Sequence, residues 1–238
     1  MFTVQGIIRR NIINVQSQFE KLGYISSNIA NMNTNGYKAV RFDQLLDEDG
    51  YLDGYVRRDY SGHGSTLRTE NLLDVALLTP GFIPVTSPTG DVTYTRDGRF
   101  KLDKEGYLIT TDGYLVGDGI QIPANYDSLR IKEDGRIFIQ QDGKTQPVEI
   151  GRIPVVQFAN AEGLKPTDGN KLIATQESGE PMLDKDNKSI VQGMVELSNV
   201  DAHGEVYNIL RLNTSMKASL KMMSVLDDMY NKSINLRQ

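Results

Sequence analysis

The glycines and prolines of this chain are confined almost entirely to its middle. Of the 22 glycines, only Gly6 and Gly23 precede residue 36, and only Gly204 follows residue 193. All eight prolines lie between Pro80 and Pro181. Because both residue types mark turns and weaken helix interiors, this distribution predicts helical ends around a turn-rich middle.

The amino-terminal end carries apolar residues at helical spacing. They step by three, four or seven residues, which is the a/d pattern of a coiled-coil seam. These seam residues are Ile8, Ile12, Val15, Phe19, Leu22 and Ile29. The run ends near Asn35-Gly36, and glycine is favoured just beyond a helix. We therefore predict a helix over residues 4–32.

The carboxyl-terminal end repeats this pattern after the capping residues Ser198 to Asp201. Its seam residues are Val206, Ile209, Leu212, Met216, Leu220, Met223 and Tyr230. A helix over residues 201–235 would be roughly 50 Å long at 1.5 Å per residue. We expect the two terminal helices to pair as a coiled-coil-like domain. Spacing alone leaves open whether they only close one subunit or also pack against other copies.

The middle of the chain has the features of an antiparallel β domain. Asp-Gly, which favours hairpin turns, occurs eight times, and the clearest case joins Val92–Arg96 to Arg99–Leu102. Further short strands are predicted over Leu129–Ile131, Arg136–Gln140, Val148–Ile150 and Ile153–Phe158. The predicted fold is therefore mixed. Residues 1–36 with 200–238 form the paired helices, 37–69 a partly extended connector in which one hairpin is an open alternative, and 70–199 an all-β outer domain.

Composition argues against most catalytic chemistry. The chain has no cysteine and only two histidines, which excludes cysteine-ligated metals and thiol nucleophiles. Its net charge is −5, so we expect no nucleic-acid partner. We predict no catalytic residues, no metal and no cofactor. We also expect no membrane-spanning segment and no cleaved signal peptide.

A carbohydrate-acting or peptidoglycan-binding β domain is the alternative to a structural protein, because carboxylates are plentiful. Such a site needs two unpaired carboxylates about 5–10 Å apart in a cleft. Eight of the aspartates lie in Asp-Gly pairs, however, and turn geometry explains aspartate at those positions.

Five segments resemble the bacterial flagellar rod and hook proteins, and they follow one another in that family's order. They span residues 26–38, 69–77, 81–100, 160–164 and 192–201. The residues that carry the resemblance include Asn28, Ala30, Asn31, Asn33, Thr34, Gly36, Tyr37, Leu73, Asp74, Tyr94, Arg96, Asp97, Gly98, Ser198, Asn199 and Val200. The chain length and the segments Leu73–Leu77 and Tyr94–Gly98 are most similar to the proximal or distal rod subunits.

The resemblance implies a structural subunit of the flagellar basal body. In this family the terminal helices line the core of a tubular axial assembly, which transmits torque and encloses an export channel, and the β domain lies outside. The implied partners are other copies of the chain, other rod and hook proteins, and the flagellar type III export apparatus. The implied location is the periplasmic rod, reached without a cleaved signal.

Overall fold

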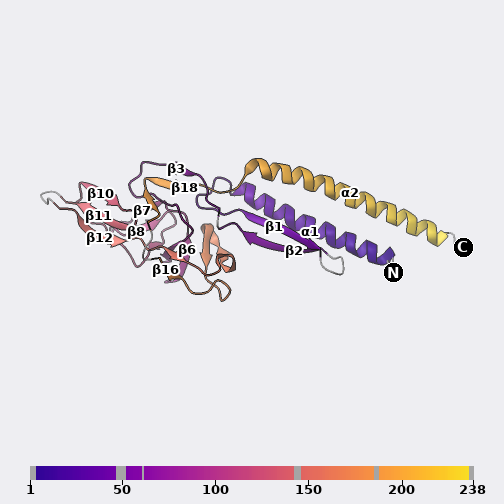
Figure 1. Cartoon of the computed structure of the whole chain (residues 1–238), viewed down its shortest axis with the longest axis horizontal. Helices are drawn as coiled ribbons and strands as arrows, with labels where there is room; N and C mark the ends of the chain where they lie inside the picture. The colour runs from indigo at the N-terminus through magenta and orange to yellow at the C-terminus, as the bar shows by residue number, and fades with distance from the viewer. Residues whose placement is uncertain (1–3, 47–51, 61, 142–145, 185–187, 236–238) are drawn as a thin grey trace. The chain divides into compact units, whose positions relative to one another are not determined.

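The computed structural model divides the chain into two compact units (Figure 1). It describes residues 4–46, 52–60, 62–141, 146–184 and 188–235. The helical unit comprises Met1–Met32, Ala39–Arg58 and Val200–Gln238, and the β unit comprises Asn33–Lys38 and Asp59–Asn199. The mixed fold predicted from the sequence is confirmed, with a helix toward each end and an antiparallel β-rich middle.

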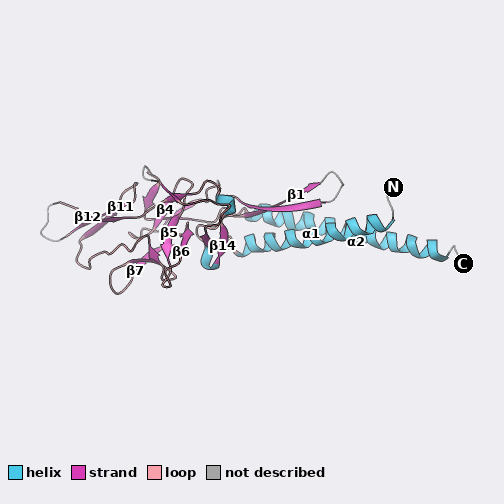
Figure 2. Ribbon diagram, turned by 90° about the horizontal axis from the view of Figure 1, so that it is seen from below, coloured by secondary structure: helices cyan, strands magenta, loops and turns pink. Residues whose placement is uncertain are grey.

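Two long helices form most of the helical unit. Helix α1 spans Val4–Ala30 and helix α2 spans Ala202–Asn235, within two residues of the predicted bounds. They lie side by side and run in opposite directions (Figures 1 and 2). Asp201 caps α2, because its Oδ1 accepts a hydrogen bond from the His203 main-chain N–H at 3.1 Å. This bond satisfies one of the amide groups that the first turn of a helix leaves unpaired.

A β-hairpin completes the helical unit. Strand β1 (Val40–Leu46) pairs antiparallel with strand β2 (Leu52–Arg58). The Phe42 ring stacks on Tyr24 of α1, with the ring centroids 5.6 Å apart. Part of the segment 37–69, predicted as a partly extended connector, is therefore a hairpin that packs on α1.

The β unit is built from short strands in antiparallel pairs (Figure 2). One sheet has the strand order β14-β15-β6-β5-β9-β8-β7. Its strands are β5 (Ile83–Thr86), β6 (Val92–Thr95), β7 (Phe100–Leu102), β8 (Leu108–Thr110), β9 (Leu115–Val116), β14 (Lys165–Thr167) and β15 (Lys171–Ile173). Short 3-10 helices at Ala161–Gly163 and Asp168–Asn170 flank β14.

The remaining strands form smaller sheets. A three-stranded sheet contains β10 (Ser128–Ile131), β11 (Arg136–Gln140) and β12 (Val148–Arg152). The two-stranded pairs are β3 (Thr66–Arg68) with β18 (Met194–Glu196), β4 (Val75–Leu77) with β17 (Ile190–Gln192), and β13 (Val156–Gln157) with β16 (Met182–Leu183). The last strands of the β unit thus pair with its first strands.

The hairpin predicted at Asp97-Gly98 is wrong. Strand β6 pairs with β5 and β15, whereas β7 pairs with β8. Gly98 instead passes closely against β4, where its carbonyl accepts a hydrogen bond from the Val75 N–H at 3.0 Å. A Cβ at residue 98 would collide with the Val75 carbonyl oxygen, so this glycine permits a close backbone approach and not a reversal of the chain.

The other Asp-Gly pairs occupy different settings. Three of them lie between antiparallel strands, namely Asp112-Gly113 between β8 and β9, Asp134-Gly135 between β10 and β11, and Asp168-Gly169 between β14 and β15. Asp53-Gly54 lies inside β2. Asp49-Gly50 and Asp142-Gly143 lie outside the described residues.

The main core of the β unit comes from alternating strand residues. In β10 and β11 every second side chain is buried, as expected for strands with one face toward a core. The residues concerned are Leu129, Ile131, Ile137 and Ile139. A second cluster gathers the aromatic side chains of Tyr60, Phe82, Tyr94 and Phe158.

Candidate functional site

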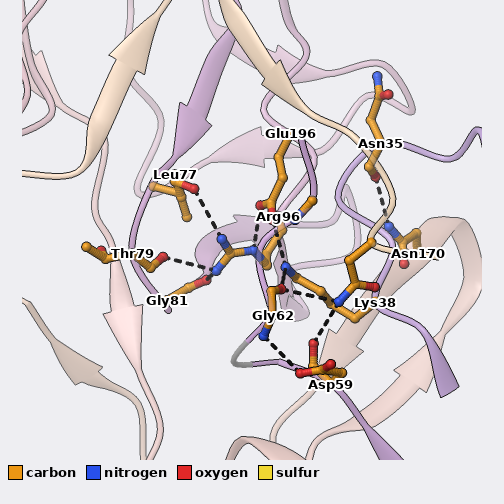
Figure 3. Close-up of polar contacts among 12 residues, drawn as sticks. Asn35, Lys38, Asp59, Gly62, Leu77, Thr79, Gly81, Arg96, Asn170 and Glu196 are labelled. Atoms are coloured by element: carbon orange, nitrogen blue, oxygen red, sulfur yellow. Dashed lines mark hydrogen bonds and ion pairs between the residues drawn. The ribbon is translucent and has the colours of Figure 1, made fainter. Parts of the chain in front are cut away.

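Three charged side chains from distant parts of the sequence meet inside the β unit (Figure 3). Lys38 ends the first segment of that unit, Arg96 follows β6, and Glu196 ends β18. Each of the three side chains is at most 3% exposed. We call these residues the ion cluster.

Glu196 is the centre of the ion cluster. Its Oε2 lies 2.8 Å from Arg96 Nε, and its Oε1 lies 2.7 Å from Lys38 Nζ. Oε1 also accepts a hydrogen bond from the Gly64 N–H at 3.1 Å. Both carboxylate oxygens are therefore engaged by groups of the chain, and this arrangement suits a carboxylate that holds segments together.

The other donors of the ion cluster bind main-chain carbonyls. Arg96 Nη1 donates to Gly81 O at 2.7 Å, and Nη2 donates to Leu77 O at 3.2 Å. Lys38 Nζ donates to the carbonyl of Gly62. The rigid, planar guanidinium thus anchors the loop after β4. Main-chain carbonyls take the place of water as hydrogen-bond acceptors for these buried cations.

The charge balance of the cluster decides its protonation. Burial disfavours the Glu196 carboxylate, but Arg96 and Lys38 outweigh that effect and hold the pKa of Glu196 below its ordinary value. Burial and the neighbouring Arg96 lower the pKa of Lys38, against the opposing pull of Glu196. Two buried cations therefore pair with one buried carboxylate, and Asp59 also favours the charged form of Lys38.

The ion cluster lies where the chain enters and leaves the β unit. On the entering segment, the Gly36 N–H donates to the Glu196 carbonyl at 2.8 Å, and the Tyr37 carbonyl accepts from the Asn199 N–H at 3.3 Å. Asn170 Nδ2 also donates to the carbonyl of Asn35 on this segment at 3.0 Å (Figure 3). The first and last segments of the unit are thus bonded to each other.

Asn28 plays a comparable part within the helical unit. Its side chain on α1 is buried, and its amide pairs with both the N–H and the carbonyl of Val40 on β1, each at 2.8 Å. Its Nδ2 also donates to Glu205 Oε1 in the first turn of α2 at 2.6 Å. One amide side chain therefore joins α1, β1 and α2.

The remaining signature residues mostly shape the backbone. Asn31 Nδ2 donates to the Ser27 carbonyl at 2.9 Å, at the end of α1. Gly36 has a φ of +67°, and a Cβ there would collide with the Arg96 backbone. Tyr37, Asp74, Tyr94 and Gly98 are buried, Thr34, Leu73, Asp97, Ser198, Asn199 and Val200 are half-buried, and Ala30 and Asn33 are exposed.

The predicted seam residues differ in their burial within the single chain. Leu212 is the buried member, and Ile8, Val15, Leu22, Ile29, Ile209, Met216 and Met223 are half-buried. Ile12, Phe19, Val206, Leu220 and Tyr230 are exposed. The buried positions of α1 are instead Asn11, Ser17, Gln18, Ile25 and Asn28.

Sequence reasoning missed Lys38 and Glu196 as site residues, although both lie inside recognised segments. The available signal was weak: Lys38 is the one charged residue of its segment, but the segments that contain Arg96 and Glu196 carry other charges as well. It also missed Asn11 and Gln18, because a search for apolar periodicity passes over amides, even where Asn11, Gln18 and Ile25 keep a heptad spacing.

Other chemistry has little support in the part of the chain that the structure describes. No group of three acidic or histidine side chains there could hold a metal ion, and neither helix is long and apolar enough to cross a membrane. A hollow beside β10 is lined by Arg130, Ile131, Lys132, Glu133, Asp134 and Lys188. Asp134 in this hollow is paired with Arg136 at 2.6 Å, so the hollow does not offer the two unpaired carboxylates of a carbohydrate-acting site.

Three family models match separate parts of the chain. The flagella basal body rod protein model matches residues 20–38, the flagellar hook protein FlgE/F/G D1 domain matches 76–139, and the flagellar basal body rod FlgEFG protein C-terminal model matches 191–236. Each matched part contains one member of the ion cluster. The three regions thus meet physically at one buried carboxylate.

Whole-length relatives agree with these matches. The chain is 31% identical to the flagellar basal-body rod protein FlgG of Buchnera aphidicola subsp. Schizaphis graminum, over 92% of this chain and 94% of that protein. It is 32% identical to the protein of the same name from Caulobacter vibrioides, over 90% and 92%. The corresponding Bacillus subtilis protein is 31% identical, over 92% and 94%.

Replacing Glu196 with glutamine should strongly destabilise the β unit. Glu196→Gln removes the carboxylate that pairs with both Arg96 and Lys38, and breaking a buried pair in this way costs about 3–5 kcal/mol. Denaturant unfolding of the full chain measures the change. Glu70→Gln is the matched control, since Glu70 pairs with Arg68 at 3.7 Å on the surface and its loss should change stability by less than about 0.5 kcal/mol. Equal effects of the two variants would contradict the role given to the ion cluster.

The stability advantage of the wild type over Glu196→Gln should depend on pH. The pKa of Glu196 is lower in the folded chain than in the unfolded chain, so its stabilising effect is complete above the unfolded pKa of about 4.3. The advantage should shrink as the pH falls below that value, because the unfolded chain then takes up a proton at this carboxyl while the folded chain still holds it ionised. Unfolding free energies of both proteins between about pH 6 and pH 2 test this. A difference that stays constant over that range would contradict the ion-pair explanation.

Removing the Asn28 amide should loosen the attachment of β1 to α1. Asn28→Ala leaves the buried N–H and carbonyl of Val40 unpaired, at a cost of about 1–3 kcal/mol. Hydrogen exchange at the Val40 amide should speed up accordingly. Asn213→Ala, at an exposed position of α2, is the control and should leave that rate unchanged. Slow Val40 exchange in Asn28→Ala would show that other contacts hold the hairpin.

Proposed function

This chain belongs to the flagellar basal-body rod protein family and is a structural subunit of the rod, and from that premise we propose that it self-assembles through the outer surfaces of α1 and α2. Successive copies build a tube whose wall transmits torque and whose channel serves export. The observation that carries the proposal is the apolar outer surface of the helix pair.

Large apolar side chains remain in solvent along both helices of the single chain. Each is at least 43% exposed, and we call them the outer apolar set: Ile12, Phe19, Val206, Tyr207, Leu210, Leu220, Met222, Val225, Met229 and Tyr230. Scattered apolar residues are ordinary on a protein surface, but many on one pair of helices are typical of an interaction surface.

The free energy available from this surface is large. Burying a large apolar side chain stabilises an interface by about 1.5–3 kcal/mol, so a few members of the outer apolar set per contact suffice for association. Five of the predicted seam residues belong to the set, namely Ile12, Phe19, Val206, Leu220 and Tyr230. Their proposed role is therefore contact with neighbouring copies, in a coiled-coil-like packing of helices around the tube axis.

The symmetry of such an assembly follows from the type of contact. Two different surfaces of one chain meet in each contact, and repetition of a contact of this kind by a screw operation gives an open helical tube. The same surfaces would bind other rod and hook proteins at the two ends of the part of the rod that copies of this subunit build.

The location of the chain is the flagellar basal body, in keeping with the relatives it resembles. We further propose the periplasmic part of the rod as its place, and delivery through the flagellar type III export apparatus without a cleaved signal. Both proposals rest on the family resemblance, and the lack of cysteine is compatible with them.

Replacing Phe19 with aspartate should block assembly and leave the subunit folded. Phe19 is 58% exposed, so Phe19→Asp removes no buried contact of the single chain but places a charge in the proposed contact between copies. Electron microscopy of basal bodies from cells that carry only the variant should show rods that stop short, while circular dichroism of the purified chain stays unchanged.

Phe19→Leu is the matched control, because it keeps an apolar side chain of similar reach. Cells with this variant should build rods of normal length. Normal rods with Phe19→Asp would overturn the assignment of this surface, and truncated rods with Phe19→Leu would show that the aromatic ring itself is required.

A further inference from the structure

The contact between α1 and α2 contains buried amides where two amphipathic helices ordinarily place apolar side chains. Gln18 is 4% exposed and Asn11 is 6% exposed. Gln18 Nε2 donates to Ser215 Oγ at 2.9 Å and lies 3.4 Å from Ser219 Oγ, and Asn11 Nδ2 donates to the Ser219 carbonyl at 3.0 Å. We call these four residues the polar seam.

The polar seam is a costly way to join two helices. Buried amides lose their hydrogen bonds to water, and hydrogen bonds within the protein recover only part of that free energy. Gln18 Oε1 is buried and has no hydrogen-bond partner among the described residues. The next residue, Phe19, is apolar and yet points to solvent. The chain thus buries amides and exposes apolar groups on one helix.

We propose that the polar seam sets the axial register of α1 against α2. A buried amide at a seam position of paired helices fixes register at the expense of stability. In the other registers Gln18 would not lie opposite two serine hydroxyls, so it would lose at least one of the present contacts across the seam. The inference concerns the free chain and holds whether or not the subunit assembles as proposed above.

The arrangement of hydroxyl groups on α2 discriminates between registers. Ser215 and Ser219 are four residues apart, so they share one helix face and a single amide reaches both. Sliding α2 by one heptad would set Gln18 against Asn208 and Leu212, or against Met222 and Leu226. Slips of three or four residues in either direction also fail to bring two hydroxyls to Gln18.

A distance measurement between spin labels tests the inference directly. The chain has no cysteine, so Ser26→Cys on α1 and Lys221→Cys on α2, both at exposed positions, give two clean labelling sites. These sites are offset along the helix axes, since Asn28 contacts Glu205 whereas Gln18 contacts Ser215. An axial slip therefore changes the distance, by up to about 5 Å for one turn and 10 Å for one heptad.

The labelled full-length chain should give one narrow distance. The double variant Asn11→Leu, Gln18→Leu should keep the helices paired through apolar contacts. It removes the amides that distinguish one register from another, so a second or shifted distance between the labels is expected. Gln16→Leu with Asn213→Leu is the matched control, because it changes exposed amides on the same helices and should keep the single distance. The same single distance in the Asn11→Leu, Gln18→Leu protein would overturn the proposal.

A second variant covers the case in which the leucine protein aggregates or loses helix content. Ser215→Ala with Ser219→Ala removes the hydroxyl partners of Gln18 and adds little apolar surface. The proposal requires a broadened or shifted distance in this protein at unchanged helix content by circular dichroism. A narrow distance equal to that of the wild type would show that the connections at the helix ends alone set the register.

Discussion

The buried carboxylate of Glu196 holds two buried cations, and the β unit is organised around this balance. Burial of three charges is expensive, and removal of the Glu196 carboxylate would take away the negative partner that Arg96 and Lys38 have in common. Lys38, Arg96 and Glu196 come from three separately matched regions of the chain. In this chain the three matched regions therefore meet at the ion cluster, which closes the β unit where the chain enters and leaves it.

The helical unit follows a different principle. Asn28 and the polar seam place amides at buried positions, whereas large apolar side chains such as Phe19 and Leu220 face solvent. Such a pair of helices gains little from its own contact and has much apolar surface left to bury. That imbalance supports the proposal that the helices pack against other copies, which would cover the apolar surface left exposed on the single chain.

Sequence patterns were reliable where a local rule sufficed. Helix bounds followed from glycine, capping residues and apolar spacing, and the strands around Leu129 and Ile137 followed from alternation. They failed where a distant partner decided the outcome. Gly98 has the local pattern of a hairpin turn. In the structure, however, it allows the backbone to pass close to Val75, which is more than twenty residues away in the sequence.

The sequence by itself determined that this chain has helical ends, an antiparallel β middle and the motifs of the rod family, because these depend on residues near one another in the chain. Only the tertiary structure decided which face of α1 is buried and that Lys38, Arg96 and Glu196 form one cluster. Burial and ion pairing depend on what lies opposite a side chain in space. A linear pattern of apolar residues cannot distinguish a surface that meets its own chain from one left free for a neighbour.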